Sequence, residues 1–318
     1  MEEHTKSLSN MFDLSTGKKY ADLVNLVNET TLWIANKNEI SKEQVMVTCG
    51  ATGALDAALS LFSSGARLAA MPYEYFDIQL LAKVRGVQIV TPPVSGDINN
   101  IDEFISFLSA DLPDACYVSL PNNPLGQEYP AEKIAKIFHV MEGRTVIVDQ
   151  TLLSKNMLPA SWFKSEAKQT RLLVVRSFSK SHGLVGERVG YIMSFSKIFR
   201  FHPYAHAPAA SSLKKVHRIW QSTESKKAMD RILANNGLME TWSVSHPQYH
   251  WTQSHSNFGC LHLTDTSAQE IAAQLKRKEF LMKTSSELGC AGNFLRLYLA
   301  GNPKIMARFL RALPYAQS

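Results

Sequence analysis

Short apolar runs alternate with stretches of helical periodicity over the first two thirds of the chain. Runs rich in apolar and β-branched residues occupy positions 45–49, 67–71, 87–91, 115–120, 145–148, 172–178 and 189–195. Apolar positions at helical spacing fill most of the segments between them, at 54–62, 76–85, 101–109 and 131–141. Strands that alternate with helices predict βαβ units, and therefore an α/β fold with a mostly parallel sheet flanked by helices.

The pattern differs at both ends of the chain. The first forty residues have apolar positions at roughly helical spacing, among them Leu23, Leu26 and Ile34, and predict a helix. After residue 196 the sequence predicts one long helix at 213–236, then a strand at 258–263, a helix at 267–278 and a strand at 294–299. We therefore expect an N-terminal helical arm at 1–44, a large domain at 45–210, and a linking helix with a small α+β domain at 211–318.

Composition narrows the class of protein. Of the 318 residues, 45% are hydrophobic and 19% are charged, as in an ordinary globular protein, and no uncharged apolar stretch predicts a membrane span. The N-terminus begins with acidic residues and lacks the apolar segment of a secretory signal. The four cysteines are far apart in the sequence, which indicates free thiols in a reducing compartment and no zinc site. We therefore expect a cytoplasmic protein without a metal.

The balance of charge is basic, with a net charge of +6. The lysines and arginines are dispersed, and no nucleic-acid recognition motif accompanies them. A basic protein of this kind suits anionic small molecules as ligands.

Polar groups follow four of the expected strands. The segment 50–52 follows the first strand, Asn123 follows the run at 115–120, Asp149 follows the run at 145–148, and the cluster 177–180 ends the run at 172–178. In open parallel sheets, ligands bind at the carboxyl ends of the strands. We therefore expect these groups to meet in one site at that edge of the sheet.

Each of these candidates also has a plainer interpretation. Asp149 either faces a protonated ring nitrogen or caps a segment or pairs with an arginine. Asn123 lies in a turn, and its amide either holds a ring hydroxyl or serves the turn alone. Tyr75 is either an ordinary half-buried aromatic residue or a stacking partner for a flat cofactor. Arg296 lies in an apolar strand pattern and needs an anion, either a structural carboxylate or the carboxylate of a substrate.

Lys180 has the most distinctive surroundings in the sequence. Two hydroxyl residues, Ser177 and Ser179, precede it at the end of an apolar run, and a glycine-punctuated loop leads from it to Arg188. Hydroxyls and an arginine beside an amine are suited to holding a phosphate next to a reactive nucleophile. An exposed lysine in a polar loop is the alternative interpretation of an isolated residue.

The segment 177–188 reads SFSKSHGLVGER and resembles the S-x-S-K…G-L-x-G-x-R signature of the class I and II pyridoxal-phosphate-dependent aminotransferases of fold type I. The resemblance extends from about residue 20 to 313 and is closest to the histidinol-phosphate aminotransferase branch. It implies pyridoxal 5′-phosphate as the cofactor, bound to Lys180 as a Schiff base, with Lys180 then moving protons. It implies that Arg296 binds the α-carboxylate of the substrate. The implied cofactor contacts are Ala51, Thr52, Tyr75, Asn123, Asp149, Ser177, Ser179, Arg188 and, from the other subunit of a homodimer, Tyr20.

Three features depart from the family pattern. The D-E-A-Y motif of the family is here Asp149-Gln-Thr-Leu152, so apolar Leu152 replaces a tyrosine that normally hydrogen-bonds the ring oxygen of the cofactor. The N-E-N-P-x-G-like element that covers the substrate has no evident counterpart, and the region 196–250 matches the family poorly. These departures leave the choice of reaction open.

The resemblance implies transfer of an amino group from an L-amino acid to a 2-oxo acid, in amino-acid or secondary-metabolite biosynthesis. A lyase, decarboxylase or cyclase on the same fold is an alternative that the loss of the tyrosine fits equally well. A non-catalytic protein that keeps the fold is a second alternative, against which the joint presence of Lys180, Asp149 and Arg188 argues.

Overall fold

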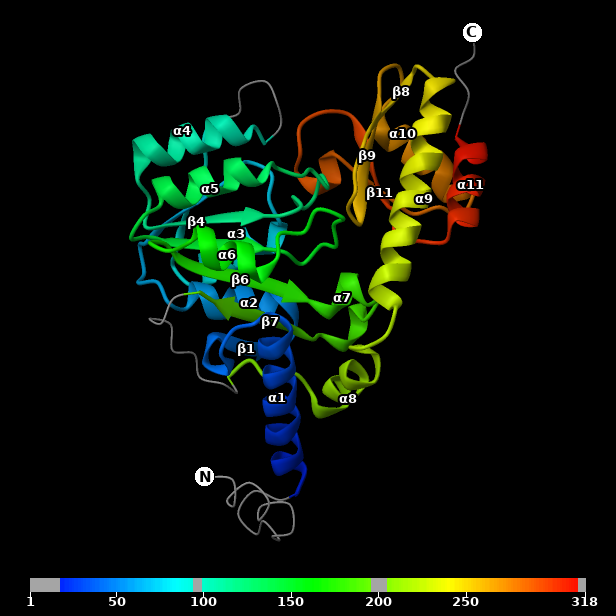
Figure 1. Cartoon of the computed structure of the whole chain (residues 1–318). Coiled ribbons are helices and arrows are strands. Elements are labelled where there is room, and N and C mark those ends of the chain that lie inside the picture. The colour runs from blue at the N-terminus through cyan, green and yellow to red at the C-terminus, as the bar shows by residue number, and fades with distance from the viewer. Residues whose placement is uncertain (1–17, 94–98, 196–204, 314–318) are drawn as a thin grey trace.

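The computed structural model describes residues 18–93, 99–195 and 205–313, and a seven-stranded sheet forms its larger part (Figure 1). The strand order is β1-β7-β6-β5-β4-β2-β3. The strands are β1 (Val45–Thr48), β2 (Arg67–Ala70), β3 (Gln88–Val90), β4 (Ala115–Ser119), β5 (Thr145–Asp149), β6 (Arg171–Ser177) and β7 (Gly190–Ser194).

The sheet is mostly parallel, as the sequence predicts. Strands β3, β2, β4, β5 and β6 pair in parallel, whereas β7 pairs antiparallel with both β6 and β1. Every residue of β4 and β5 is buried, which explains their continuous apolar runs. The carboxyl ends of the five parallel strands consequently lie at one edge of the sheet, as expected of a ligand-binding edge.

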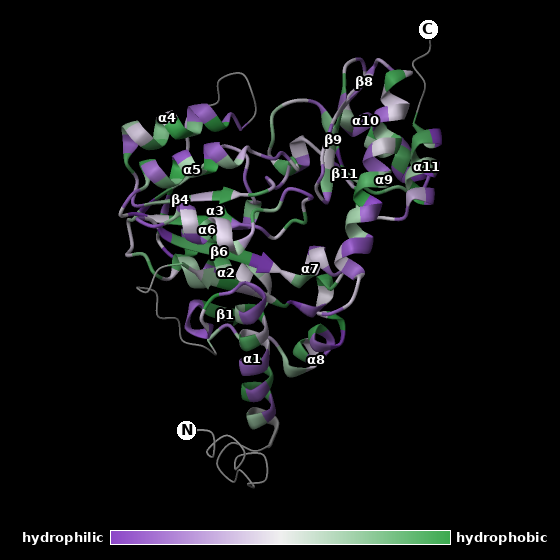
Figure 2. Cartoon of the chain, in the orientation of Figure 1, coloured by the Kyte–Doolittle hydropathy of each residue, from purple (hydrophilic) through white to green (hydrophobic). Residues whose placement is uncertain are grey.

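Helices cover both faces of this sheet. Alternate residues of β4 and β5 pack in two separate cores: Tyr117 and Ile147 pack with helices α2 and α3, and Val118 and Val148 pack with α4, α5 and α6. The green apolar residues of the helices in Figure 2 lie beside purple polar ones, as in helices with one buried face. The helices are α2 (Gly50–Leu59), α3 (Phe76–Val84), α4 (Ile101–Asp111), α5 (Ala131–Val140) and α6 (Ala160–Glu166).

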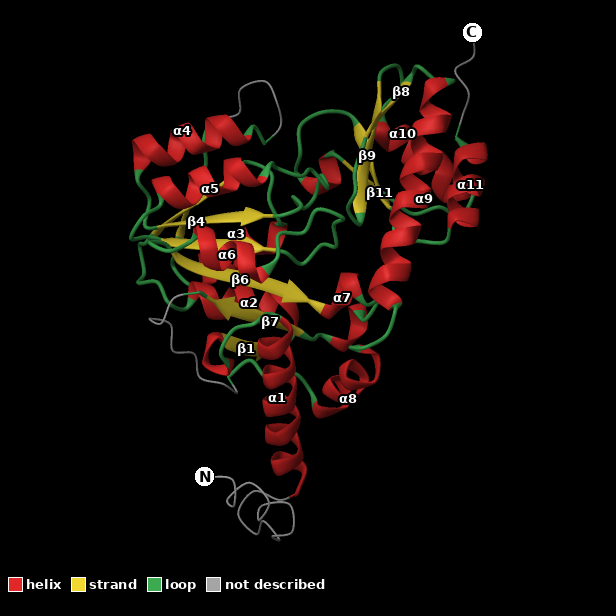
Figure 3. Ribbon diagram, in the orientation of Figure 1, coloured by secondary structure: helices red, strands yellow, loops and turns green. Residues whose placement is uncertain are grey.

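A four-stranded antiparallel sheet, in the order β10-β11-β9-β8, forms the second part of the fold (Figure 3). Its apolar face packs with three helices around Ile232, Leu261 and Leu297. The sheet contains β8 (Tyr249–Thr252), β9 (Phe258–Leu263), β10 (Lys283–Thr284) and β11 (Phe294–Tyr298), and the helices are α9 (Glu224–Val244), α10 (Ala268–Arg277) and α11 (Pro303–Ala312). The boundaries at residues 44 and 210 stay a prediction.

One long helix at 213–236 was expected, and that prediction is wrong. The chain instead forms α8 (Ala210–Ile219) and α9, separated by four residues. Trp220, the residue directly after α8, stacks on Trp33 of α1 (Lys18–Lys37), with ring centroids 4.7 Å apart. This contact directs α8 against α1, while α9 runs on to the second sheet (Figure 1).

Other element boundaries also differ from the sequence-based expectation. Helix α2 starts at Gly50 and not at residue 54, and the segments that form α6, α11 and β8 were not anticipated. Helix α6 has seven residues and strand β8 has four, which are too few to show a clear period, whereas the apolar residues of α11 do follow helical spacing. Within the described ranges, no helix is long and apolar enough to cross a membrane.

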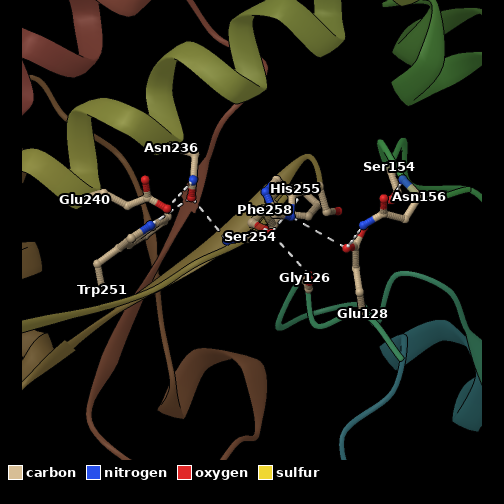
Figure 4. A network of polar contacts seen from close by, with 11 residues as sticks. Gly126, Glu128, Ser154, Asn156, Asn236, Glu240, Trp251, Ser254, His255 and Phe258 are labelled. Atoms are coloured by element: carbon tan, nitrogen blue, oxygen red, sulfur yellow. Dashed lines mark hydrogen bonds and ion pairs between the residues drawn. The ribbon is translucent and has the colours of Figure 1, made fainter. Parts of the chain in front are cut away.

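Loops at the ends of β4 and β5 contact the loop that precedes β9 (Figure 4). The Ser254 hydroxyl donates to the Gly126 carbonyl oxygen at 3.2 Å, and the Leu153 amide donates to the Asn257 side-chain oxygen at 2.6 Å. In the same region, the Glu128 carboxylate accepts hydrogen bonds from Ser154 and from the Asn156 amide. These contacts join the two sheets next to the carboxyl ends of β4 and β5.

Gly126 is the tightest point of this junction and yields a stability prediction. Its φ is +73°, and a Cβ atom at this position would collide with the backbone carbonyl of Phe258. We expect Gly126→Ala to lower the free energy of unfolding by about 3 kcal/mol, because left-handed strain and a backbone clash add together. Urea denaturation measures this loss.

Gly143→Ala is the matched control for that substitution. Gly143 has a similar φ of +72°, and no heavy atom lies within 4 Å of its added Cβ. Only the left-handed strain of about 1 kcal/mol should then apply. Equal losses for the two variants would show that the junction at Gly126 is not tightly packed.

Candidate active site

The expected site residues meet in one cavity of about 360 Å³ at the carboxyl edge of the large sheet. Residues from the second sheet close its other side, among them Phe258 of β9 and Arg296 of β11. The cavity is lined by every described residue of the expected set: Ala51, Thr52, Tyr75, Asn123, Asp149, Ser177, Ser179, Lys180, Arg188 and Arg296. Tyr20 lies in the first turn of α1, and its side chain is outside the described part of the chain.

Lys180 lies on the short helix α7 (Phe178–Ser181), directly after β6. Its side chain is half-buried, and its Nζ atom lies 5.5 Å from the ring centroid of Phe258 and 5.8 Å from that of Tyr298. Burial lowers the pKa of the Lys180 amine, and the positive charges of Arg296 and Arg188 lower it further. The amine therefore loses its proton, and becomes nucleophilic, more readily than a lysine in water.

The first turn of α2 and Arg188 form the anion-binding end of the cavity. Gly50 begins α2 with a φ of +79°, and a Cβ atom there would lie 2.9 Å from Nη2 of Arg188. The same Nη2 donates to the Thr52 hydroxyl at 3.4 Å, and Arg188 has no ion pair with a carboxylate of the described residues. Free amides at a helix start beside an unpaired guanidinium are the donor set that a phosphate requires.

Ser177 and Ser179 occupy the turn between β6 and Lys180. The Ser177 side-chain oxygen caps α7 by accepting from the Ser179 amide at 3.0 Å, and its hydroxyl donates to the Val189 carbonyl at 3.3 Å. Both serines are buried. The second contact ties the Lys180 turn to the segment just after Arg188, so amine and guanidinium are held in a fixed relation.

Asp149 ends β5, and only 5% of its surface is exposed. The Tyr117 hydroxyl donates to one carboxylate oxygen at 2.9 Å, and the Thr151 amide donates to the other at 2.8 Å. Burial raises the pKa of Asp149, and the hydrogen bonds from Thr151 and Tyr117 act against this rise because they favour the charged form. In its charged form, the Asp149 carboxylate can pair with a positive group in the cavity.

Arg296 and Asn123 meet across the cavity from opposite sheets. The Arg296 Nη1 donates to the Asn123 Oδ1 at 3.4 Å, and the guanidinium carbon lies 4.3 Å from the ring centroid of Phe258. Burial lowers the pKa of Arg296, and no described carboxylate forms an ion pair with it. A half-buried guanidinium with this environment favours an anionic ligand over a structural salt bridge.

Tyr75 and Leu152 also line the cavity. The Tyr75 hydroxyl bonds to Asp77, and burial together with that carboxylate raises the pKa of Tyr75 to about 12. Its stacking on a cofactor ring stays a prediction. Leu152 is 2% exposed, so the cavity wall is apolar at the position where the family motif has a tyrosine.

Among the residues of the site that were not expected from the sequence are Glu74, Tyr117 and Phe258. Glu74 lies in the segment MPYEY, where a carboxylate between two tyrosines after a strand was a usable signal. Tyr117 lies inside a buried strand and Phe258 begins one, and aromatic residues at such positions usually belong to the core. Their contacts with the site depend on strand pairing, which the sequence does not state.

The chain matches known proteins over nearly its whole length. The model of the family described as aminotransferase class I and II matches residues 12–313. A relative from Dechloromonas aromatica (strain RCB), histidinol-phosphate aminotransferase 1, is 23% identical over 317 residues, with 94% of this chain and 82% of the relative covered.

Solved structures share the fold. The histidinol-phosphate aminotransferase from Clostridium acetobutylicum aligns with a TM-score of 0.73 at 17% identity, covering 98% of this chain and 92% of its own. The L-threonine-O-3-phosphate decarboxylase from Porphyromonas gingivalis aligns with a TM-score of 0.66 at 17% identity, covering 95% of both chains. The arrangement of a mixed, mostly parallel sheet with flanking helices is common to them all.

The hydrogen bond from Tyr117 to Asp149 yields a second prediction. We expect Tyr117→Phe to lower the free energy of unfolding by about 1.5–3 kcal/mol at neutral pH, because a buried carboxylate loses a donor. The raised pKa of Asp149 makes its carboxyl neutral earlier on acidification when folded than when unfolded. The loss should therefore shrink as the pH falls through that pKa, as measured by urea denaturation at a series of pH values.

Tyr129→Phe is the control, because Tyr129 is partly buried and its hydroxyl makes hydrogen bonds only to uncharged groups, at 3.4–3.5 Å. Its loss should stay below about 1 kcal/mol and should not depend on pH in this range. A pH-independent loss in Tyr117→Phe would contradict a charged Asp149.

Proposed function

The chain belongs to the class I and II aminotransferase family, and we propose that it transfers the amino group of an L-amino acid to a 2-oxo acid with pyridoxal 5′-phosphate as its cofactor. The observation that carries this proposal is the content of one cavity. A half-buried amine, a buried carboxylate and two guanidiniums without described carboxylate partners line the same space.

The residues of the cavity fit this cofactor. Arg188, the start of α2 at Ala51 and Thr52, and the serines at 177 and 179 would hold its phosphate. The close approach of the Arg188 guanidinium to Gly50, where an added Cβ atom would collide with it, supports this placement. Asp149 would pair with the ring nitrogen, Asn123 would hold the ring oxygen, and Tyr75 would stack on the ring.

The chemistry that pyridoxal phosphate supplies is an aldehyde that captures amines and a ring that withdraws electrons. Asp149 would keep the ring nitrogen protonated by its negative charge. Arg296 would orient the substrate through its α-carboxylate, bonding both oxygens. Lys180 would take the proton from the substrate α-carbon at its Nζ atom. The lowered pKa of Lys180 supports this role, since an unprotonated amine is needed.

A decarboxylase or another lyase is a second candidate function. Leu152 places an apolar side chain where the family motif has a tyrosine hydroxyl, which removes one hydrogen bond to the ring oxygen. A decarboxylase with the same fold, the L-threonine-O-3-phosphate decarboxylase, matches this chain over 95% of both lengths and supports keeping this candidate. Release of carbon dioxide from an amino acid without formation of a 2-oxo acid would identify it.

Further features of the proposal concern assembly and location. We expect a homodimer in which Tyr20 of one subunit reaches the cofactor phosphate of the other, as the family resemblance implies. The four cysteines are free thiols, three of them buried, which supports a reducing cytoplasm. The division of the chain at residues 44 and 210 belongs to the same proposal.

Replacement of Lys180 tests the proposal directly. Purified protein mixed with pyridoxal phosphate should absorb as a lysine-bound form, and borohydride should remove that band. Lys180→Ala should lose this band and lower turnover by at least about a thousandfold, because both the nucleophile and the proton carrier are absent. Unchanged turnover in this variant would exclude the assigned role and would favour a non-catalytic binding protein.

Lys37→Ala is the matched control for Lys180→Ala. Lys37 is also a lysine whose pKa is lowered by burial, but it packs over Trp33 outside the cavity. The band and its borohydride sensitivity should persist in this variant. Persistence of the band in both variants would show that unspecific lysine chemistry produces it.

Arg296→Lys tests recognition of the α-carboxylate. Lysine keeps the charge but loses the two-pronged geometry of the guanidinium, so KM for the amino acid should rise roughly ten- to a hundredfold with a smaller change in kcat. Titration of the cofactor absorbance with the amino acid and with the corresponding amine, which lacks the carboxylate, separates the contributions. The affinity for the amine should be alike in both proteins. A similar loss for the amine would mean that Arg296 acts on another part of the ligand.

A further inference from the structure

Glu74 is a buried carboxyl in the wall of the cavity, and the proposed function gives it no role. It lies between β2 and α3, is 7% exposed, and lines the cavity together with Asp149. One of its oxygens accepts from the Ser119 amide at 3.3 Å, and the other meets the Ser119 hydroxyl and accepts from the Asn122 amide at 3.2 Å. Through these hydrogen bonds, the Glu74 carboxyl fixes the end of β4 and the turn that follows it.

The Ser119 hydroxyl joins Glu74 to the turn that carries Asn123. Its oxygen accepts from the Asn123 backbone amide at 3.0 Å, so Glu74, Ser119 and Asn123 form one chain of hydrogen bonds. The Asn123 side chain continues this chain to Arg296 at 3.4 Å. Glu74 is therefore connected to a proposed cofactor contact and to the proposed substrate arginine without touching either.

Glu74 and Asp149 cannot both be charged without cost. Ser119 pairs with Asp149 in the register of β4 and β5, so the two carboxyls lie on either side of the end of one strand. The titratable groups that face Glu74 are Asp149, Cys116, Tyr117 and Tyr129, none of which is a cation. When two carboxyls lie close together in a site that excludes water, the pKa of one of them is raised, so that this carboxyl holds a proton.

The hydrogen-bond donors decide which carboxyl stays charged. Asp149 receives a tyrosine hydroxyl and a backbone amide, and it faces the cavity where a cationic ring nitrogen would bind. Burial and the charge of Asp149 raise the pKa of Glu74 well above its usual value, and only its contacts with Ser119 and the Tyr75 backbone act against this. The Ser119 hydroxyl lies within hydrogen-bond distance of one Glu74 oxygen; it donates to an ionised Glu74 and would accept from a protonated one.

We propose that Glu74 is a positioning residue that stays protonated and donates a hydrogen bond to the Ser119 oxygen. This hydrogen bond orients the Asn122–Asn123 turn, and the neutral Glu74 leaves Asp149 as the charged carboxyl of the site. This inference rests on the proposed function, since it assigns Asp149 and Asn123 to the cofactor. In the opposite arrangement Glu74 is ionised and the Ser119 hydroxyl donates to it. That arrangement would place two negative charges around one strand end.

Infrared spectroscopy of the cofactor-free protein tests the protonation directly. At neutral pH, wild-type protein should show the carbonyl band of a buried carboxylic acid, and Glu74→Gln should lack it. Glu128→Gln is the matched control: the Glu128 carboxylate also meets a serine hydroxyl and an asparagine amide, and it lies outside the cavity lining (Figure 4). The band should persist in that control. Absence of the band from wild type, or its retention in Glu74→Gln, would overturn the proposal.

Cofactor affinity tests the positioning role. Glutamine can accept from the Ser119 amide and donate to its hydroxyl, and it loses only the contact with Asn122. The dissociation constant of pyridoxal phosphate, followed by its absorbance, should rise less than about threefold in Glu74→Gln and about tenfold or more in Glu74→Ala, which leaves buried polar groups unpaired. Equal, large losses in both variants would show that a charged Glu74 is required and would contradict the proposal.

The two experiments distinguish this inference from the proposed function. If wild-type protein fails to bind pyridoxal phosphate, the function is wrong, while the infrared result still reports whether Glu74 is protonated. If wild type binds the cofactor and Glu74→Ala does so with unchanged affinity, the function stands and the positioning role is refuted. If Glu74→Ala does not fold, the comparison of wild type, Glu74→Gln and Glu128→Gln decides the protonation on its own.

Discussion

The close packing of β7 against the first turn of α2 is the contact on which the site depends. A Cβ atom at Gly190 would lie 2.6 Å from the Gly50 carbonyl carbon and 2.9 Å from the Ala51 amide nitrogen, so only glycine permits this approach. Strand β7 returns antiparallel beside β6 and brings Arg188 back to the start of α2. The amine of Lys180 and the guanidinium of Arg188, eight residues apart in sequence, therefore face one cavity.

The charges of the cavity are arranged by the same constraint. Positive groups come from the end of β6, from the loop before β7 and from β11, whereas the buried carboxyls stand at the ends of β2 and β5. Burial disfavours the charged forms of Lys180, Arg296 and the two carboxyls, and hydrogen bonds such as that from Tyr117 to Asp149 favour the charged form again. A ligand with an anionic and a cationic part would complete what the protein leaves unpaired.

Much of the fold and most of the site could be predicted from the sequence, for a physical reason. The parallel strands are buried on both faces, so they read as continuous apolar runs, and their carboxyl ends must meet at one edge. That is why Asp149, Asn123 and the cluster around Lys180 could be placed together. The break between α8 and α9 was not predicted, and the stacking of Trp220 on Trp33, nearly two hundred residues away, is a contact that the sequence does not reveal. Tyr117 and Glu74 were not predicted as site residues for a related reason: their hydrogen-bond partners lie on other strands.

The two sheets contribute different kinds of residue to the cavity, and this separates cofactor binding from the choice of reaction. The residues that we propose as cofactor contacts, apart from Tyr20, come from the large sheet and its loops, whereas Arg296 and Phe258 come from the second sheet. The two sets touch through the Asn123–Arg296 hydrogen bond and through the loop contacts at Gly126. A change in the second sheet can therefore turn a substrate relative to the ring without disturbing the amine or the phosphate pole. Since the bond that breaks is the one held perpendicular to the ring, the proposed orientation of the substrate by Arg296, together with the apolar wall at Leu152, would govern the outcome more than the proposed cofactor contacts would.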